Sequence, residues 1–261
     1  MLDYINTDNL EKAFKSYQGA FPFDYCVVDN FFDQQMAENL SNDFPEFNDE
    51  IWHQYDNPIE IKKVSNLWNI FPPTTYSVFS DLNSPEFVKY LSQISNIDPL
   101  YSDNGLNGGG WHMLNNGGKL NPHLDYSMHP KLPLQRKINL IVYLNKNWEE
   151  EWGGELGLWS STENGTKPKK IEKIVPPLFN RAIFFDTTMD SWHGLYNIVN
   201  SPENEFRKSM AIYYLTDPPG DVDERAKALF APTDDQKGDK SIEELIKKRA
   251  DVKSASDVYK K

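Results

Sequence analysis

Two stretches of this chain, KINLIVYLN at residues 137–145 and RKSMAIYYLT at residues 207–216, are typical of β-strands. Both are rich in Ile, Leu, Val and Tyr, the residues that fit the pleated, half-buried surface of a sheet. Shorter runs of the same kind lie around them, separated by turn residues such as Gly153-Gly154 and Pro176-Pro177. These runs are WHML (111–114), the segment 121–125, GELGLW (154–159), KIEKIV (170–175) and RAIFFD (181–186). Short strands at such regular spacing predict a sandwich or barrel-like double sheet.

The sequence on either side of these runs has helical patterns. We expect helices at 8–18, after a capping Asp33, and after Ser84-Pro85, where proline takes the first helical position. One short strand, DYCVVD at 24–29, precedes the second of these helices. Near the end of the chain, SIEELIKKRAD at 241–251 predicts a surface helix followed by a loose tail. The expected fold is therefore mainly β with flanking helices (α+β).

The domain organisation follows from the same change between helical and β-strand sequence patterns. No internal repeat or low-complexity linker divides the 261 residues, which suit a single catalytic domain. We expect a helix-rich N-terminal part with a leading strand at 1–104, a β core with the functional site at 105–220, and a helical C-terminal extension at 221–261.

Composition narrows the classes of partner. The net charge is −12 with no Lys/Arg-rich run, which argues against extended nucleic-acid binding. The single cysteine, Cys26, can form no intramolecular disulfide and fits a reducing compartment. The sequence shows no signal-peptide pattern and no run of apolar residues long enough for a membrane span, so we expect a cytoplasmic protein without a membrane partner. The oligomeric state stays open.

Three residues form a candidate metal site. His123 and Asp125, in NPHLDY, lie two positions apart, so on a strand their side chains point to the same side. His193, in DSWHGLY, could return beside them on a neighbouring strand. Two imidazoles and one carboxylate, with open positions left over, suit the non-haem Fe(II) oxygenases. The non-functional alternative is a pair of hydrogen-bonded structural histidines. A zinc hydrolase also competes: the helical HExxH and a cysteine cluster are absent, but the ligand types alone do not exclude zinc.

A fourth residue, Arg207, begins the strand at 207–216. Strand alternation places Arg207, Ser209, Ala211 and Tyr213 on one face. A guanidinium group buried on such a face needs an anionic partner, and its fork matches a carboxylate in two parallel hydrogen bonds. The Ser209 hydroxyl would lie beside it. The alternative is an ordinary ion pair with one of the acidic residues of the chain.

Taken in order, His-x-Asp, His and Arg-x-Ser, with KINLIVYLNKNW and WGGELGLW between them, resemble the Fe(II)/2-oxoglutarate-dependent dioxygenases of the prolyl 4-hydroxylase type. The resemblance covers roughly residues 105–230, and FPFDYCVVDNFFD at the front is similar to the usual start of that domain. It implies a double-stranded β-helix (jelly-roll, cupin-like) core. It also implies Fe(II), 2-oxoglutarate and O2 as cofactor and cosubstrates, with ascorbate as an optional addition.

The same resemblance implies roles for individual residues. His123, Asp125 and His193 would hold the iron, and Arg207 would bind the distal carboxylate of 2-oxoglutarate. Tyr143 falls where relatives place a tyrosine that helps hold this carboxylate; an ordinary core aromatic is the alternative. Leu156 and Tyr213 would line the pocket, and Gly153-Gly154 would form a tight bend. Two departures stand out: the segment between His193 and Arg207 is longer than in many prolyl hydroxylases, and Met113 replaces a tyrosine that contributes a pocket hydrogen bond.

The substrate is open at this stage. The resemblance favours a prolyl residue in a peptide or protein, with a free amino acid or another small metabolite as the alternative, and succinate and CO2 as coproducts. A non-catalytic cupin-like binding protein is the second alternative. The loops 46–62 and 126–136 are the expected substrate rim. The individual residues expected there are Trp111, Tyr126, His129 and Trp192.

Overall fold

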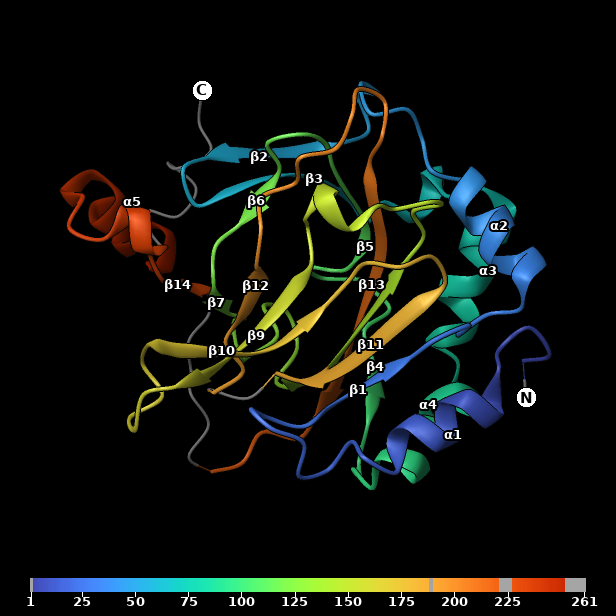
Figure 1. The fold of residues 1–261 in the computed structure, drawn as a ribbon. Coiled ribbons are helices and arrows are strands. Elements are labelled where there is room, and N and C mark those ends of the chain that lie inside the picture. Colours follow the sequence, from blue (N-terminus) through green and yellow to red (C-terminus); the bar gives the residue numbers. More distant parts are fainter. Residues whose placement is uncertain (1, 188–189, 221–226, 252–261) are drawn as a thin grey trace.

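The alternating runs fold into two antiparallel sheets in the computed structural model, which describes residues 2–187, 190–220 and 227–251 (Figure 1). In the larger, nine-stranded sheet the main order is β1-β11-β8-β13-β5-β3-β2, with β4 beside β13 and β6 beside β3. Its strands are β1 (Tyr25–Val28), β2 (His53–Asn57), β3 (Glu60–Ser65), β4 (Tyr101–Ser102), β5 (Gly110–Leu114), β6 (Lys119–Leu120), β8 (Gln135–Tyr143), β11 (Arg181–Asp186) and β13 (Arg207–Thr216).

The smaller sheet has five strands in the order β10-β9-β12-β7-β14. They are β7 (His123–Leu124), β9 (Leu156–Ser161), β10 (Pro168–Val175), β12 (His193–Leu195) and β14 (Leu229–Phe230). A cavity between the two sheets is lined by residues from both. This confirms the expected mainly β fold with a jelly-roll core.

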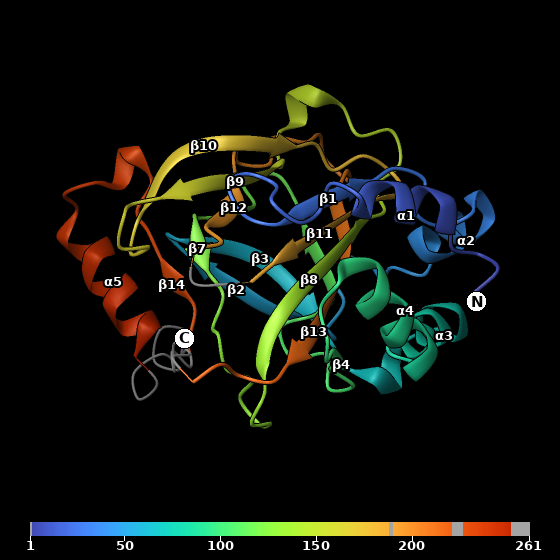
Figure 2. The same ribbon diagram turned by 90° about the horizontal axis from the view of Figure 1, so that it is seen from below.

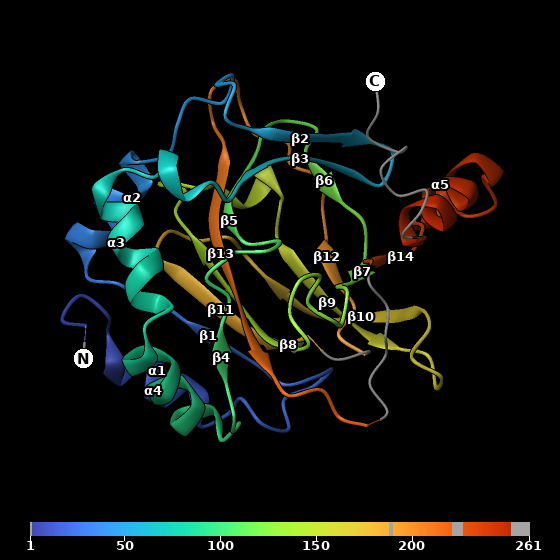
Figure 3. The same cartoon turned by 180° about the vertical axis from the view of Figure 1, so that it is seen from behind.

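Four helices cover the outer face of the larger sheet (Figures 2 and 3). They are α1 (Thr7–Phe14), α2 (Gln34–Asn42), α3 (Pro73–Leu82) and α4 (Pro85–Ser95). Their apolar sides pack on buried residues of β5, β8 and β13, including Trp111, Leu140 and Ile212, to form the main hydrophobic core. The inner face of the sheet is thereby left to line the cavity.

A fifth helix, α5 (Lys240–Ala250), lies apart from the other four, beside β14. Ile242 of α5 packs with Ile59, Ala228 and Phe230 in a small separate hydrophobic cluster. The expected C-terminal helix is therefore present, and its docking places it near the cavity. The loose tail expected after residue 251 lies outside the described residues.

Most sequence-based element predictions are confirmed with small changes of boundary. The predicted strands 181–186 and 207–216 have those bounds in the structure. The side chains of Asp33 and Ser84 accept hydrogen bonds from the backbone N–H groups of Met36 and Phe87, as N-terminal caps do. The first helix ends earlier than expected, at Phe14. The hairpin β2–β3 and helix α3 were not predicted. No helix of the described residues is both long and apolar enough to cross a membrane.

Candidate metal centre and anion pocket

The two histidines of the predicted metal site lie side by side in the smaller sheet. His123 begins β7 and His193 begins β12, and these two residues are directly paired in the antiparallel ladder. Their ring centroids are 4.3 Å apart. Asp125 follows directly after β7 and points to the same side as His123, while the intervening Leu124 packs against Trp192 in the wall. Strand pairing therefore joins three residues that are far apart in the sequence.

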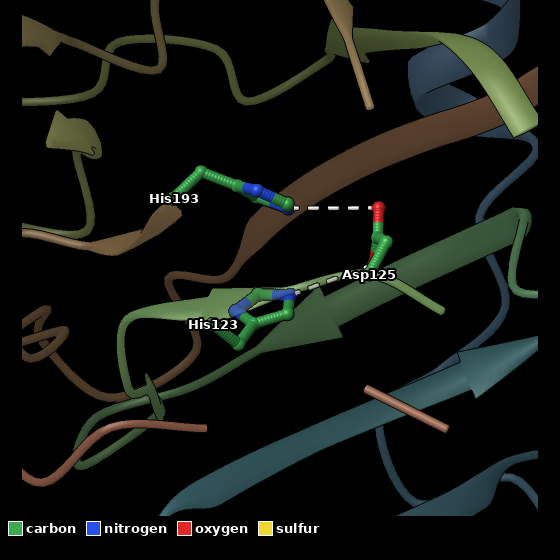
Figure 4. Close-up of side chains that lie close together, drawn as sticks. All are labelled: His123, Asp125 and His193. Carbon is green, nitrogen blue, oxygen red and sulfur yellow. Dashed lines mark ion pairs between the residues drawn. The ribbon is translucent and has the colours of Figure 1, made fainter. Parts of the chain in front are cut away.

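The three side chains converge on one point, as Figure 4 shows. Nε2 of His123 lies 3.7 Å from Oδ1 of Asp125, and Nε2 of His193 lies 3.7 Å from Oδ2. One possible ligand atom of each residue lies within 4.8 Å of the other two. Nδ1 of His123 is 3.0 Å from the carbonyl oxygen of Asn121, and Nδ1 of His193 is 2.8 Å from that of Ser191. A carbonyl can only accept, so each Nδ1 carries a hydrogen, and Nε2 is the nitrogen that each ring turns towards Asp125.

The charge states of His123 and Asp125 suit a cation. Burial lowers the pKa of His123 to about 3, helped by the neighbouring His193, so its imidazole is neutral at physiological pH. Burial alone would raise the pKa of Asp125, but the nearby His193, Arg136 and His123 and the Tyr213 hydrogen bond lower it to about 2. Neutral imidazoles and an ionised carboxylate are the forms that bind metal ions.

Arg207 forms a second feature of the same cavity. It begins β13, is 5% exposed, and donates from Nε to the carbonyl oxygen of Gly154 at 2.6 Å. Its guanidinium carbon lies 4.9 Å from the ring centroid of Tyr143, a fully buried residue of β8. Within the described part of the chain, no carboxylate lies at ion-pair distance from Arg207. A buried guanidinium without a carboxylate partner is suited to an anionic ligand.

One cavity of about 480 Å³ connects these two features. The face predicted from strand alternation lines it in full, with Arg207, Ser209, Ala211 and Tyr213. The triad of His123, Asp125 and His193 also lines it, as do the predicted residues Leu156 and Tyr126. The bend at Gly153-Gly154 is present, with φ of +65° and +74°. The expected metal ligands and the expected anion-binding residue therefore belong to a single pocket.

Three residues expected at the substrate rim do not line this cavity. Trp111 is 1% exposed and packs in the main core beneath the helices. Trp192 is fully buried and donates from its ring nitrogen to the carbonyl oxygen of Gly165 at 2.9 Å. His129 is 6% exposed, and its Nδ1 accepts from the backbone N–H groups of Lys131 and Leu132. All three have structural positions, and the expectation of a rim position for them was wrong.

Met113, which was expected to replace a tyrosine of the pocket, does not line the cavity. Met113 is 1% exposed and faces the main core, not the cavity. Its neighbour His112 lines the cavity instead. Burial lowers the pKa of His112 to about 3, with Lys62 and Arg207 adding to the effect. A neutral imidazole at position 112 therefore faces the cavity.

Several charged lining residues were not named individually from the sequence. They are Glu60 and Lys62 of β3, Arg136 of β8, Lys227 beside β14 and Arg249 of α5; the first three lie within the segments 46–62 and 126–136 that were expected at the rim. The alternation of EIKKVS could have indicated the first two, but this run is mostly charged and lacks the apolar pattern of a strand. Arg249 reaches the cavity only because α5 docks beside β14, which no local sequence pattern indicates.

Comparison with known sequences adds independent information. Residues 109–216 match the sequence profile described as the 2OG-Fe(II) oxygenase superfamily. The segment that matches contains the triad, Tyr143, Arg207 and Ser209. Prolyl 3-hydroxylase OGFOD1 of Mus musculus is 31% identical over 86 residues, which cover 32% of this chain and 16% of that protein. The chain therefore spans less than a fifth of the length of this relative.

Comparison with solved structures supports the fold. A prolyl-4-hydroxylase from Pseudomonas putida superposes with a TM-score of 0.55 at 13% identity, covering 78% of this chain and 97% of that one. SnoN, a non-haem alpha-ketoglutarate-dependent epimerase of nogalamycin biosynthesis, superposes with a TM-score of 0.54 at 14% identity, covering 87% and 85%. At these identities the likeness shows a shared fold and nothing about substrate.

Proposed function

Because residues 109–216 match the profile of the 2OG-Fe(II) oxygenase superfamily, we propose that this chain is an Fe(II)- and 2-oxoglutarate-dependent oxygenase that hydroxylates an unactivated C–H bond. The observation that carries this proposal is the presence of the triad and Arg207 in one cavity. A structural pair of histidines would not need a buried arginine nearby that lacks a carboxylate partner.

The donor set fits iron. His123 and His193 would bind through Nε2 and Asp125 through its carboxylate, leaving the remaining positions of the ion open to the cavity. The carbonyl oxygens of Asn121 and Ser191 fix both imidazoles in the tautomer and orientation that present Nε2. This second layer of hydrogen bonds is typical of metal-binding histidines.

The pocket also fits 2-oxoglutarate. Arg207 would bind the distal carboxylate, with its orientation held by the hydrogen bond to Gly154. The Tyr143 hydroxyl beside it and the Ser209 hydroxyl on the same strand face would supply further donors, and Leu156 would cover the chain of the cosubstrate. When bound, Fe(II) and 2-oxoglutarate supply the oxidation of C–H by O2, with release of succinate and CO2. The protein residues orient the substrate and exclude water from the cavity.

The proposed substrate is a prolyl residue of a peptide or protein, or a free amino acid or other small metabolite. The sequence similarity to a prolyl 3-hydroxylase favours the first, but it covers only 32% of this chain. The cavity volume of about 480 Å³ is large enough for the cosubstrate and one further side chain or small molecule.

The decisive test is an anaerobic titration of the protein with Fe(II) and then 2-oxoglutarate. We expect a weak visible charge-transfer band when both are present. In Arg207→Met the metal should still bind, but the affinity for 2-oxoglutarate should fall by at least about 30-fold, because truncating one partner of a buried charge pair costs about 2–5 kcal/mol.

Arg181→Met is the matched control. Arg181 lies on β11, and its guanidinium pairs with Asp29 at 2.6 Å, outside the cavity. Its loss should leave the band unchanged. Tightly held zinc with no band on adding 2-oxoglutarate would overturn the oxygenase and favour a zinc hydrolase. A band without 2-oxoglutarate consumption under air would favour the non-catalytic binding protein.

A further inference from the structure

The cavity has the opposite charge to the protein as a whole. The complete chain carries 27 Lys and Arg against 39 Asp and Glu. Among the described residues, the basic side chains that line the cavity are Lys62, Arg136, Arg207, Lys227 and Arg249. The acidic ones are Glu60 and Asp125. Among the described lining residues, five basic against two acidic side chains leave an excess of three positive charges in this acidic protein.

Strand alternation brings Lys62 to this pocket. On β3, Glu60, Lys62 and Val64 line the cavity, while Lys63 points away and lies 4.0 Å from the ring centroid of Phe47. Nζ of Lys62 is 3.7 Å from Oε2 of Glu60. Burial lowers the pKa of Lys62 despite this neighbour, so one carboxylate does not fully offset the cost of its position.

A β-bulge brings Arg136 to the pocket. Tyr214 pairs with Ile138, but the next residue of β13, Leu215, pairs with Arg136, so that Lys137 has no partner on β13. Without this extra residue, Arg136 would share the face of Ile138, which is buried in the main core. The bulge turns Arg136 to the inner face, which is a common use of bulges beside functional sites.

The surroundings of Arg136 hold it rigidly. It is 1% exposed, and its guanidinium carbon lies 3.5 Å and 3.6 Å from the ring centroids of Tyr126 and Tyr213. Nη2 donates to the carbonyl oxygen of Asn107, whereas the buried Nε has no hydrogen-bond partner among the described residues. Gly108 leaves room for it, because a Cβ there would lie 2.6 Å from Nη2. A fixed buried cation with an unmatched donor is suited to an anion that enters the cavity.

Helix α5 contributes the third of these cations. Nε of Arg249 lies 3.2 Å from Oε1 of Glu60, which begins β3 of the larger sheet. The guanidinium carbon of Arg249 is 5.7 Å from the ring centroid of Phe230. Phe230 in turn stacks on His123, with ring centroids 5.1 Å apart. Arg249 therefore lies one aromatic ring away from the metal triad.

We propose that the substrate of this site carries a carboxylate, which Lys62, Arg136 and Arg249 receive. This inference rests on the proposed function. The charges of Fe(II) and 2-oxoglutarate cancel, so both can bind without removing the excess of three. A neutral substrate would bring no charge to the described excess of basic side chains, whereas an anionic substrate is attracted by their field. The carboxylate can belong to a free acid or to the acidic side chain of a peptide.

The test uses the 261-residue protein loaded with Mn(II) and saturated with 2-oxoglutarate. Three probes are compared: N-acetyl-L-alanine, N-acetyl-L-glutamic acid α-amide and the neutral N-acetyl-L-alaninamide. The paramagnetic relaxation of the acetyl protons reports binding beside the metal. We expect at least one carboxylate probe to bind about tenfold or more tightly than the neutral probe, a difference of about 1.4 kcal/mol. The carboxylate probe that binds more tightly shows whether the site prefers a terminal or a side-chain carboxylate.

Variants connect this preference to named residues. Lys62→Met and Arg249→Met should each reduce binding of the preferred carboxylate several-fold, with no effect on the neutral probe. Lys63→Met is the matched control, since Lys63 lies on the same strand but points away from the cavity. Equal relaxation of all three probes, or no relaxation of any, would overturn the inference. If the charge-transfer band of the earlier titration is present in that case, the oxygenase proposal stands and only the carboxylate inference fails.

Discussion

The hydroxyl of Tyr213 donates a hydrogen bond of 2.8 Å to Oδ2 of Asp125. Both residues are buried, and Tyr213 belongs to the larger sheet while Asp125 follows a strand of the smaller one. Burial and the nearby Asp125 raise the pKa of Tyr213, so the phenol remains a donor. The hydrogen bond joins the two sheets at the metal site and fixes the orientation of the carboxylate.

Tyr213→Phe should weaken metal binding. The lost hydrogen bond to a charged group is worth about 1.5–3 kcal/mol, and loss of such a partner typically lowers metal affinity by about 10- to 100-fold. Competition with a fluorescent chelator for Co(II) measures the affinity without turnover.

Tyr214→Phe is the control for this experiment. Tyr214 is the next residue of β13, is also buried, and donates its hydroxyl to the carbonyl oxygen of Leu82 at 2.9 Å on the far side of the sheet. It should lose about 1 kcal/mol of stability and keep its metal affinity. Equal Co(II) affinity in both variants would show that the Tyr213 hydrogen bond does not orient Asp125.

Gly154→Ala should impair 2-oxoglutarate binding by moving Arg207. A Cβ at position 154 would lie 3.0 Å from Cδ of Arg207 and 3.1 Å from Cγ2 of Val199, and the backbone has φ +74°. We expect the affinity for 2-oxoglutarate to fall by about tenfold, equivalent to about 1.4 kcal/mol, with metal affinity retained. Isothermal titration of the metal-free protein with Co(II), and then of the loaded protein with 2-oxoglutarate, measures the two affinities.

Gly117→Ala separates backbone strain from this displacement. Gly117 has a similar φ of +84°, but a Cβ there meets nothing within 4 Å. It should lose about 1–2 kcal/mol of stability through the left-handed conformation alone. A loss of 2-oxoglutarate affinity in Gly117→Ala as large as in Gly154→Ala would mean that general destabilisation is the cause.

The sequence predicted the parts of the fold and site that follow from local periodicity. The strand at 207–216 has a clean period of two, so its bounds and its cavity face were predictable. The pair His123 and Asp125 was predictable for the same reason. The approach of His193 needed the family resemblance as well, because no local pattern shows which strands pair.

Other parts depend on tertiary pairing and could not be predicted. Trp111 was expected at the rim, but β5 pairs Trp111 with the core residue Met210, so His112 faces the cavity. A short strand such as WHML has no internal feature that fixes which face is inward. Arg136 lies just before the predicted strand start and turns inward through a bulge that only the register with β13 shows.

The metal-free protein should lose stability as the pH falls from about 6.5 towards 5. Burial lowers the pKa of both His112 and His123 to about 3, whereas in the unfolded chain each titrates near 6.5. In this window the unfolded state binds more protons than the folded state, so acid favours unfolding. Each histidine contributes a slope of up to about 1.4 kcal/mol per pH unit.

His112→Gln should therefore reduce this slope by about one histidine's share. Urea unfolding with a chelator present, repeated across the pH window, measures the free energy of unfolding directly. The variant is less stable or more stable at neutral pH according to its packing, but the slope depends only on the protons bound. An unchanged slope in His112→Gln would show that His112 binds its proton equally well in the folded and unfolded states.

A bound divalent metal should stabilise the folded protein, because the three ligands converge only when β7 and β12 pair in the folded chain. At a Co(II) concentration about 100-fold above Kd, the gain is about 2.7 kcal/mol, which raises Tm by roughly 5–10 °C in a chain of this size. Addition of a chelator should reverse the shift.

His193→Ala should abolish the Co(II)-induced rise in Tm. His53→Ala should retain it, because His53 lines the same cavity from β2 without belonging to the triad. Calorimetry of both variants with and without Co(II) tests this, and a full shift in His193→Ala would place the metal elsewhere in the protein.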